Sequence, residues 1–94
     1  MEKFLKSQIN AIWKLLPLKE EENVGLHDYL DGLRIQLIGA TRTYEVLEND
    51  DNYNKIINII NYMMIDRDME FERYRRETFK CISIINKILG KEKA

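Results

Sequence analysis

Apolar residues recur along most of the chain at the three- and four-residue steps that place side chains on one face of an α-helix. The clearest run lies in the first half of the sequence and covers about six helical turns. Its members are Leu26, Tyr29, Leu30, Leu33, Leu37, Ala40, Tyr44 and Leu47. We therefore expect a helix over residues 24–48, with Asn23 as its N-cap.

Two further segments show the same periodicity. We expect a helix over residues 2–16, which Pro17 should end because the residue before a proline is disfavoured in the α region. Another helix is predicted over residues 51–65, capped by an aspartate of the turn at residues 49–52. Its isoleucines favour strands, but their spacing fits a helical period and not strict alternation.

The last periodic segment predicts a helix over residues 68–90. Asp66 or Asp68 should cap its start, and Gly90 fits the position just beyond its end. Four such helices, with one proline and four glycines in 94 residues, predict an all-α fold. We expect an antiparallel helical bundle of about four helices that forms a single domain over residues 1–94.

The sequence predicts a cytoplasmic protein. Its single cysteine, Cys81, cannot form an intramolecular disulfide, and it lies on the apolar face of the helix predicted over residues 68–90. The N-terminal residues do not form the apolar core of a signal peptide. No run approaches the roughly 18 apolar residues of a membrane span, so we expect no membrane partner.

The glycines are unusual because they are evenly spaced. Gly25, Gly32 and Gly39 are seven residues apart, and Val46 continues the series. Positions at this spacing stay nearly in line along a helix, and each internal glycine costs up to about 1 kcal/mol relative to alanine. Ile35 lies on the same side, away from the main apolar stripe. Either this helix touches several neighbours in the bundle, or its second face is an interface for a partner.

Charge patterning gives one further candidate surface. Basic and acidic residues nearly cancel, at 15 and 16, which is not typical of a general nucleic-acid binder. However, Arg73, Arg76, Lys80 and Lys87 share one side of the last predicted helix. Such a row can contact phosphates or an acidic protein surface. It can equally be a solvated face with local ion pairs to Glu72 and Glu77.

Catalytic chemistry has little support in the sequence. The only histidine, His27, has one carboxylate on its own helix face, Asp31, and no third metal ligand is indicated. No glycine-rich phosphate loop, zinc-finger spacing or calcium loop is present. We therefore expect no metal, no cofactor and no enzymatic activity; a small hydrolase that uses His27 is a weaker hypothesis.

The function that we predict is a non-catalytic helical protein-interaction module. It would bind a protein partner, either another protein or a second copy of itself. Small size and thirteen isoleucines, typical of AT-rich coding, suggest an accessory or inhibitor protein of a phage, plasmid or other mobile element. The alternative is a small nucleic-acid-binding regulator that uses the basic row. The predicted interaction residues are Gly32, Ile35, Gly39, Val46, Arg73, Arg76 and Lys80.

Overall fold

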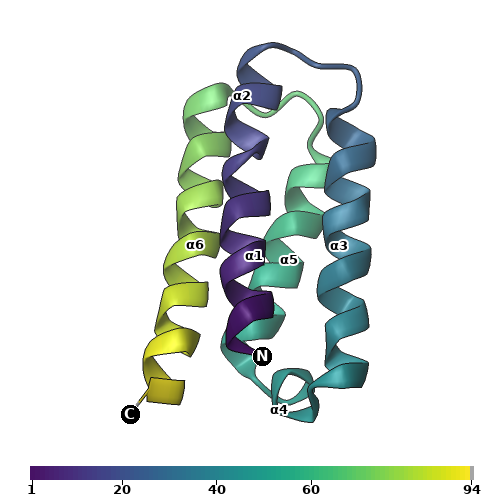
Figure 1. Cartoon of the computed structure of the whole chain (residues 1–94). Helices are drawn as coiled ribbons and strands as arrows, with labels where there is room; N and C mark the ends of the chain where they lie inside the picture. Colours follow the sequence, from purple (N-terminus) through teal and green to yellow (C-terminus); the bar gives the residue numbers. More distant parts are fainter. Residues whose placement is uncertain (94) are drawn as a thin grey trace.

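The chain folds into an antiparallel helical bundle, as expected from its periodicity (Figure 1). The computed structural model describes residues 1–93, and the side chains of residues 1–91. Within that part, all the regular structure is helical, and no helix is long and apolar enough to cross a membrane. The helices are α1 Glu2–Trp13, α2 Leu15–Glu20, α3 Leu26–Thr43, α4 Glu45–Glu48, α5 Asp51–Ile65 and α6 Phe71–Lys93.

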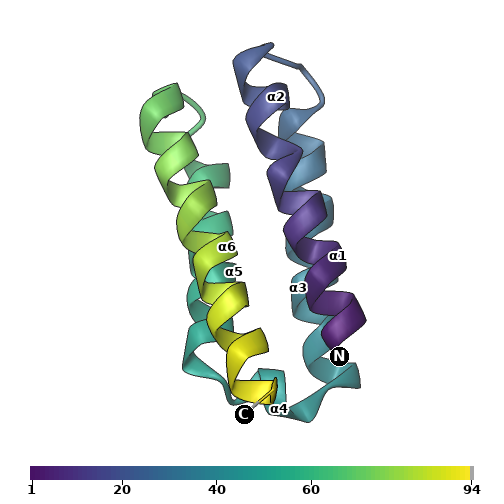
Figure 2. The same cartoon turned by 60° about the vertical axis from the view of Figure 1, so that its left-hand side comes forward.

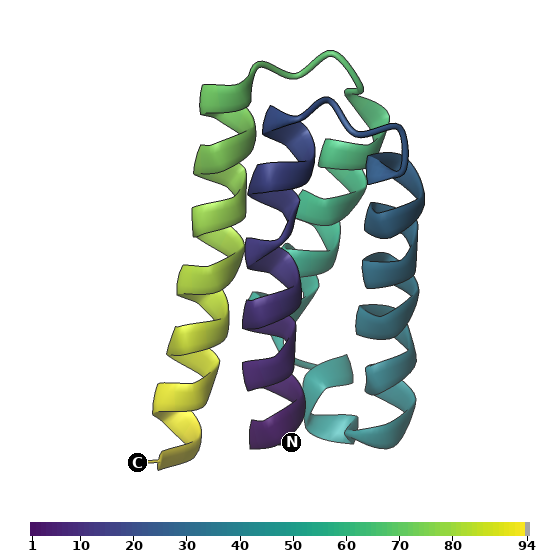
Figure 3. The ribbon, with the colours of Figure 1, turned by 45° about the horizontal axis from the view of Figure 1, so that its top comes forward.

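The long helices form two layers. Figure 2 shows α5 and α6 on one side, and α1, α2 and α3 on the other. The closest helix pairs across and within these layers are α5 with α6, α1 with α6, and α3 with α5. Successive long helices therefore run in opposite directions around a common core. The N-terminus, α4 and the C-terminal end of α6 lie at the same end of the bundle (Figure 3).

Pro17 does not end the first helix, which corrects the boundary expected at residue 16. Instead α1 ends at Trp13, and α2 continues in nearly the same direction through Pro17 to Glu20 (Figure 1). Proline lacks the N–H that would bond to the carbonyl four residues earlier, here Trp13. The helix is interrupted at that residue, while Pro17 itself occupies the first turn of α2, where its missing N–H has no intrahelical partner.

The connection from α2 to α3 also differs from expectation. Glu22 has a φ of 52°, the left-handed conformation that often ends a helix. The Asn23 N–H then donates to the Leu18 carbonyl at 3.0 Å. Asn23 is not the N-cap of α3, because Gly25 holds that position. The Asn23 side chain instead accepts a hydrogen bond from the Gly25 N–H at 2.7 Å, which stabilises the turn before the helix.

The helix expected over residues 24–48 is divided in two. Tyr44 is extended, with φ −121° and ψ 93°, so α3 ends at Thr43 and α4 begins at Glu45. The Tyr44 ring packs against Phe4 of α1, with 5.9 Å between ring centroids. Leu47 of α4 is nevertheless buried. The periodic apolar residues thus reach the core as expected, although the backbone bends between them.

α5 occupies residues 51–65, which confirms the expected bounds. Its N-cap is Asp50, whose carboxylate accepts the Tyr53 backbone N–H at 3.0 Å. This bond satisfies one of the free N–H groups in the first turn.

The last helix starts and ends later than expected. α6 begins at Phe71, and neither Asp66 nor Asp68 caps it with a side-chain hydrogen bond among the described residues. Residues 66–70 instead form a loop that inserts Met69, which is buried, into that end of the core. Gly90 is not a helix terminator, because α6 continues to Lys93. Lys91 follows this glycine, and positive charge is favourable in a last helical turn.

Two tyrosines differ in how their buried hydroxyl groups are satisfied. Tyr53 of α5 donates to the Leu37 carbonyl of α3, a buried hydrogen bond that ties these helices together. Tyr74 of α6 is equally buried, but its hydroxyl has no hydrogen-bond partner within the described part of the chain. Burying a polar group without a partner costs free energy. The two hydroxyls should therefore contribute to stability with opposite signs.

We predict that Tyr53→Phe lowers the free energy of unfolding by about 1 kcal/mol, because it removes a satisfied buried hydrogen bond. The matched substitution Tyr74→Phe removes an unpartnered hydroxyl, so stability should stay the same or rise. Urea unfolding followed by circular dichroism measures both. An equal loss of stability in the two variants would contradict this assignment.

Candidate functional site

α3 has an outer face that is partly apolar and has no neighbour in the bundle. We define this outer face as Asp28, Gly32, Ile35, Ile38, Gly39 and Arg42. It lies opposite the buried leucines of the same helix, on the side of α3 that has no other described helix beside it (Figures 1 and 3). Ile35 is 58% exposed and Ile38 is 38% exposed. The outer face thus places two large apolar side chains in solvent at the middle of the helix.

The glycines of α3 are not explained by close packing inside the chain. A Cβ atom added to Gly32 or Gly39 would have no described atom within 4 Å, apart from the neighbouring backbone of its own helix. Alanine would therefore fit at both positions and would favour the helix by up to about 1 kcal/mol each. α3 contacts α2, α4 and α5, and its buried residues lie on the side away from the outer face. Close packing among the described residues therefore does not account for the two glycines.

Val46 does not extend the glycine row along one helix, which corrects that part of the prediction. It lies on α4, beyond the bend at Tyr44, and is 60% exposed. Gly25 lies at the N-cap of α3 and packs near the Asn23 side chain. The candidate surface on α3 is therefore centred on Ile35, with Val46 beyond its C-terminal end.

Charges on the outer face are arranged asymmetrically. Asp28 lies in the first turn of α3 and Arg42 in the last turn. Neither forms an ion pair within the described part of the chain. Asp31, by contrast, pairs with Arg34 at 2.8 Å. The outer face has an acidic end, an apolar centre and a basic end.

Much of the basic row on α6 is engaged within the molecule. Arg73 donates a hydrogen bond to the Tyr62 hydroxyl and lies over the Tyr62 ring, 5.1 Å from its centroid. Lys80 pairs with Glu77 at 3.1 Å, as the helical spacing predicts. Arg76 forms no ion pair among the described side chains. Glu72 pairs with Arg75 instead, at 3.4 Å.

The structure adds a second helix to the basic surface. A groove of about 410 Å³ runs between α5 and α6, and Lys55, Lys80 and Lys87 line it. Asn58 and Ser83 add polar groups, and no carboxylate lines the groove among the described residues. Lys55 could not be assigned to this surface from the sequence, because helical spacing shows which residues share a face of one helix but not which residues of two helices lie together.

An exposed aromatic pair was also missed. Trp13 of α1 and Phe79 of α6 pack edge to face with 5.1 Å between ring centroids, and both are 39% exposed. The Arg75 guanidinium lies over the Phe79 ring at 5.3 Å. Tryptophan and arginine are common in the centres of protein interfaces. However, this pair joins α1 to α6, and packing within the bundle is enough to account for it.

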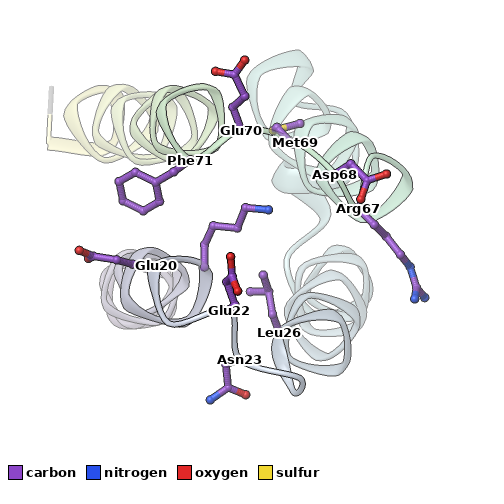
Figure 4. Close-up of a pocket in the computed structure, with 10 residues that line it drawn as sticks. Glu20, Glu22, Asn23, Leu26, Arg67, Asp68, Met69, Glu70 and Phe71 are labelled. Atoms are coloured by element: carbon purple, nitrogen blue, oxygen red, sulfur yellow. The ribbon is translucent and has the colours of Figure 1, made fainter.

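A further cavity lies at the end of the bundle where the α2–α3 and α5–α6 connections meet (Figure 4). Its volume is about 600 Å³, and its charged side chains are of both signs. Lys19 lines it and lies over the Tyr74 ring, 5.3 Å from the centroid. The charged lining residues are Lys19, Glu20, Glu22, Arg67, Asp68 and Glu70.

The structure does not bring His27 and Asp31 together as a chemical pair. The Asp31 carboxylate is held by Arg34, while His27 lines a small cavity beside Asp66. Within the described residues, no group of three or more histidine, cysteine or carboxylate side chains is placed to hold a metal ion.

Cys81 is fully buried in the core, as expected from its position on α6. Burial raises the pKa of its thiol to about 12; the nearby Glu77 carboxylate also raises this pKa, and Lys80 lowers it. The thiolate is the reactive form of cysteine, so Cys81 is a core residue and is not reactive near neutral pH.

Comparison of the chain with protein-family models, with curated proteins and with solved structures gave no match.

We predict that Cys81 in the folded protein reacts with iodoacetamide on the order of a hundredfold more slowly than in 6 M guanidinium chloride. Because the raised pKa lies far above this range, the rate in the folded protein should rise about tenfold per pH unit between pH 7 and pH 9 without levelling off, whereas a thiol with an ordinary pKa of about 8.5 would begin to level off by pH 9. Mass spectrometry of timed samples measures the adduct. A rate in the folded protein close to that of the unfolded chain would contradict the buried position.

Proposed function

We propose that the protein is a non-catalytic interaction module that binds another protein chain through the outer face of α3. The single observation that supports this most strongly is the uncovered centre of that face, where Ile35 is 58% exposed between two glycines that no other part of the bundle approaches. A partner helix lying on Gly32 and Gly39 would approach the backbone closely, which would offset the helical cost of both residues.

Exposure of one apolar side chain is common and carries little meaning. Here Ile35 and Ile38 are adjacent on the surface of one helix, and Val46 is exposed on the following helix, α4. A cluster of this kind, flanked by charges, is typical of a binding surface. A cytoplasmic accessory role in a mobile element fits the chain's small size and composition, and that setting is proposed on those grounds alone.

Site-specific photo-crosslinking in cells tests this function. A photoreactive amino acid placed at Ile35 should form covalent adducts with a protein. The matched control is Ile65, at the end of α5, which is 82% exposed but has no glycines beside it. We expect adducts at position 35 and at most a trace at position 65. No adduct at position 35, or equal adducts at both positions, would refute the proposal.

The alternative function is binding of a nucleic acid by the basic surface. The groove between α5 and α6 favours it, because three lysines from two helices line it and no described carboxylate does. Arg73 and Arg76 continue the basic surface along α6, although Arg73 is held by Tyr62. Lysines arranged in this way can contact phosphates and would make binding salt-dependent.

If this alternative holds, labelled RNA or DNA should bind at 50 mM salt and lose affinity as salt rises. A variant with Lys55, Lys80 and Lys87 changed to alanine should then bind about tenfold or more weakly, since each lysine contacts phosphate. The matched control changes Lys3, Lys6 and Lys14 of the first helix and its end, which alters net charge equally. Absence of binding at 50 mM salt, or equal losses in both variants, would eliminate the groove as a nucleic-acid site.

A further inference from the structure

We infer that the occupant of the outer face of α3 is a second copy of the same chain, packed antiparallel with Ile35 at the two-fold axis. This inference rests on the proposed function of the outer face and specifies its partner. Two identical helices that pack antiparallel through one face must satisfy a simple rule: each residue lies opposite the residue equally far from the axis on the other side. With the axis at Ile35, this rule places residues of opposite charge, and large and small residues, opposite one another.

Electrostatic complementarity is the first argument. Asp28 and Arg42 lie seven residues before and after Ile35. At 1.5 Å per residue, each charge is about 10 Å from the axis. Asp28 of one copy therefore lies opposite Arg42 of the second copy, and symmetry forms this pair twice. Both side chains lack an ion-pair partner within the described part of the chain, so they are free to form it.

The same charges argue against a parallel pair. In a parallel arrangement Asp28 would face Asp28 of the second copy, and Arg42 would face Arg42. Like charges placed opposite one another disfavour association. The charge pattern therefore favours the antiparallel over the parallel arrangement of two copies.

Shape complementarity is the second argument. Around an axis at Ile35, Ile38 of one copy lies opposite Gly32 of the other, so the isoleucine side chain meets bare backbone. Ile35 contacts Ile35 at the axis itself, and Gly39 lies opposite Asp31. Helices that pack in this way have axes about 8–10 Å apart, and the Ile35 pair at the centre places this one near the upper value. The isoleucines and glycines of the outer face then complement one another.

An effect within one molecule also favours these charges. An acidic residue in the first turn and a basic residue in the last turn both interact well with the helix dipole. That effect acts on the stability of a single copy and does not depend on protein concentration. Reversing both charges together would worsen the dipole interaction but would preserve the pairing between copies. The two explanations therefore predict different results for the doubly reversed protein.

The size of the outer face limits the strength of the dimer. α3 has 18 residues, which makes it about 27 Å long. One face of such a helix covers much less than the roughly 800 Å² per partner of a standard stable interface. We therefore expect a reversible dimer with a dissociation constant in the micromolar range or weaker. Val24 and Val46, both strongly exposed and eleven residues from Ile35, lie beyond the two ends of α3.

Sedimentation equilibrium of purified protein, from about 1 μM to 1 mM, tests the inference. The unmodified chain should pass from monomer to dimer as concentration rises. Asp28→Arg or Arg42→Asp alone should raise the dissociation constant about tenfold or more, because two attractive pairs become two repulsive pairs. The combined Asp28→Arg and Arg42→Asp protein should dimerise like the unmodified chain. Circular dichroism of dilute samples checks that each variant is folded.

A cysteine variant tests the position of the axis independently. With Ile35→Cys, the two introduced thiols should lie close enough to form a disulfide, which requires Cα atoms about 4.4–6.8 Å apart. Mild oxidation at 10 μM should then give a covalent dimer. Ile65→Cys, the matched exposed control, should remain monomeric. Cys81 is buried and should not interfere.

Several outcomes would overturn the inference. A protein that stays monomeric at 1 mM would do so, and so would a doubly reversed protein that dimerises no better than the single variants. Equal oxidation at positions 35 and 65 would reject the axis. These failures can be told apart from failure of the proposed function. A crosslink from position 35 to a different protein, in a chain that stays monomeric, would support the interaction surface and would rule out a second copy as its partner.

Discussion

The structure depends on burying one apolar face from each long helix in a single shared core. The chain has 94 residues, and Cys81, its one cysteine, cannot form an intramolecular disulfide. Stability must therefore come mainly from the hydrophobic effect and from close packing. α6 contributes much to this core, since it packs against α1, α2 and α5. α3 is held mainly from one side, by α5 with help from α2 and α4, and this arrangement exposes its outer face.

The links between α1 and α3 show how the bundle is completed on that side. The Tyr29 hydroxyl of α3 donates to the Ala11 carbonyl of α1 at 2.6 Å, and the Gln8 amide donates to Gln36 at 3.2 Å. These bonds fix α3 relative to α1 through side chains. α3 is thus anchored by its inner and lateral contacts, and its backbone need not fold on binding, which lowers the ordering cost of binding.

The two candidate surfaces differ in how many of their side chains form contacts within the molecule. On α6, intramolecular contacts engage several of the basic side chains: Arg73 with Tyr62, and Lys80 with Glu77. On α3, Ile35, the glycines and the terminal charges have no such contacts among the described residues. Unsatisfied features that share one face are better evidence for a partner than charge alone, because a solvated charged face needs no partner to be stable.

The sequence by itself determined the fold class, because apolar spacing of three and four residues is a local property of a helix. It also placed Leu30, Leu33 and Leu37 of α3 and Cys81 of α6 on buried faces. The errors fell at the boundaries. Pro17 is tolerated because it lies in the first turn of α2, and Tyr44 interrupts a helix where its ring packs against Phe4. Gly90 continues α6, although glycine is typical of a helix end. Only the tertiary structure could show that Lys55 joins Lys80, that Trp13 meets Phe79, and that no other helix covers Gly32 and Gly39, since each depends on residues far apart in the chain.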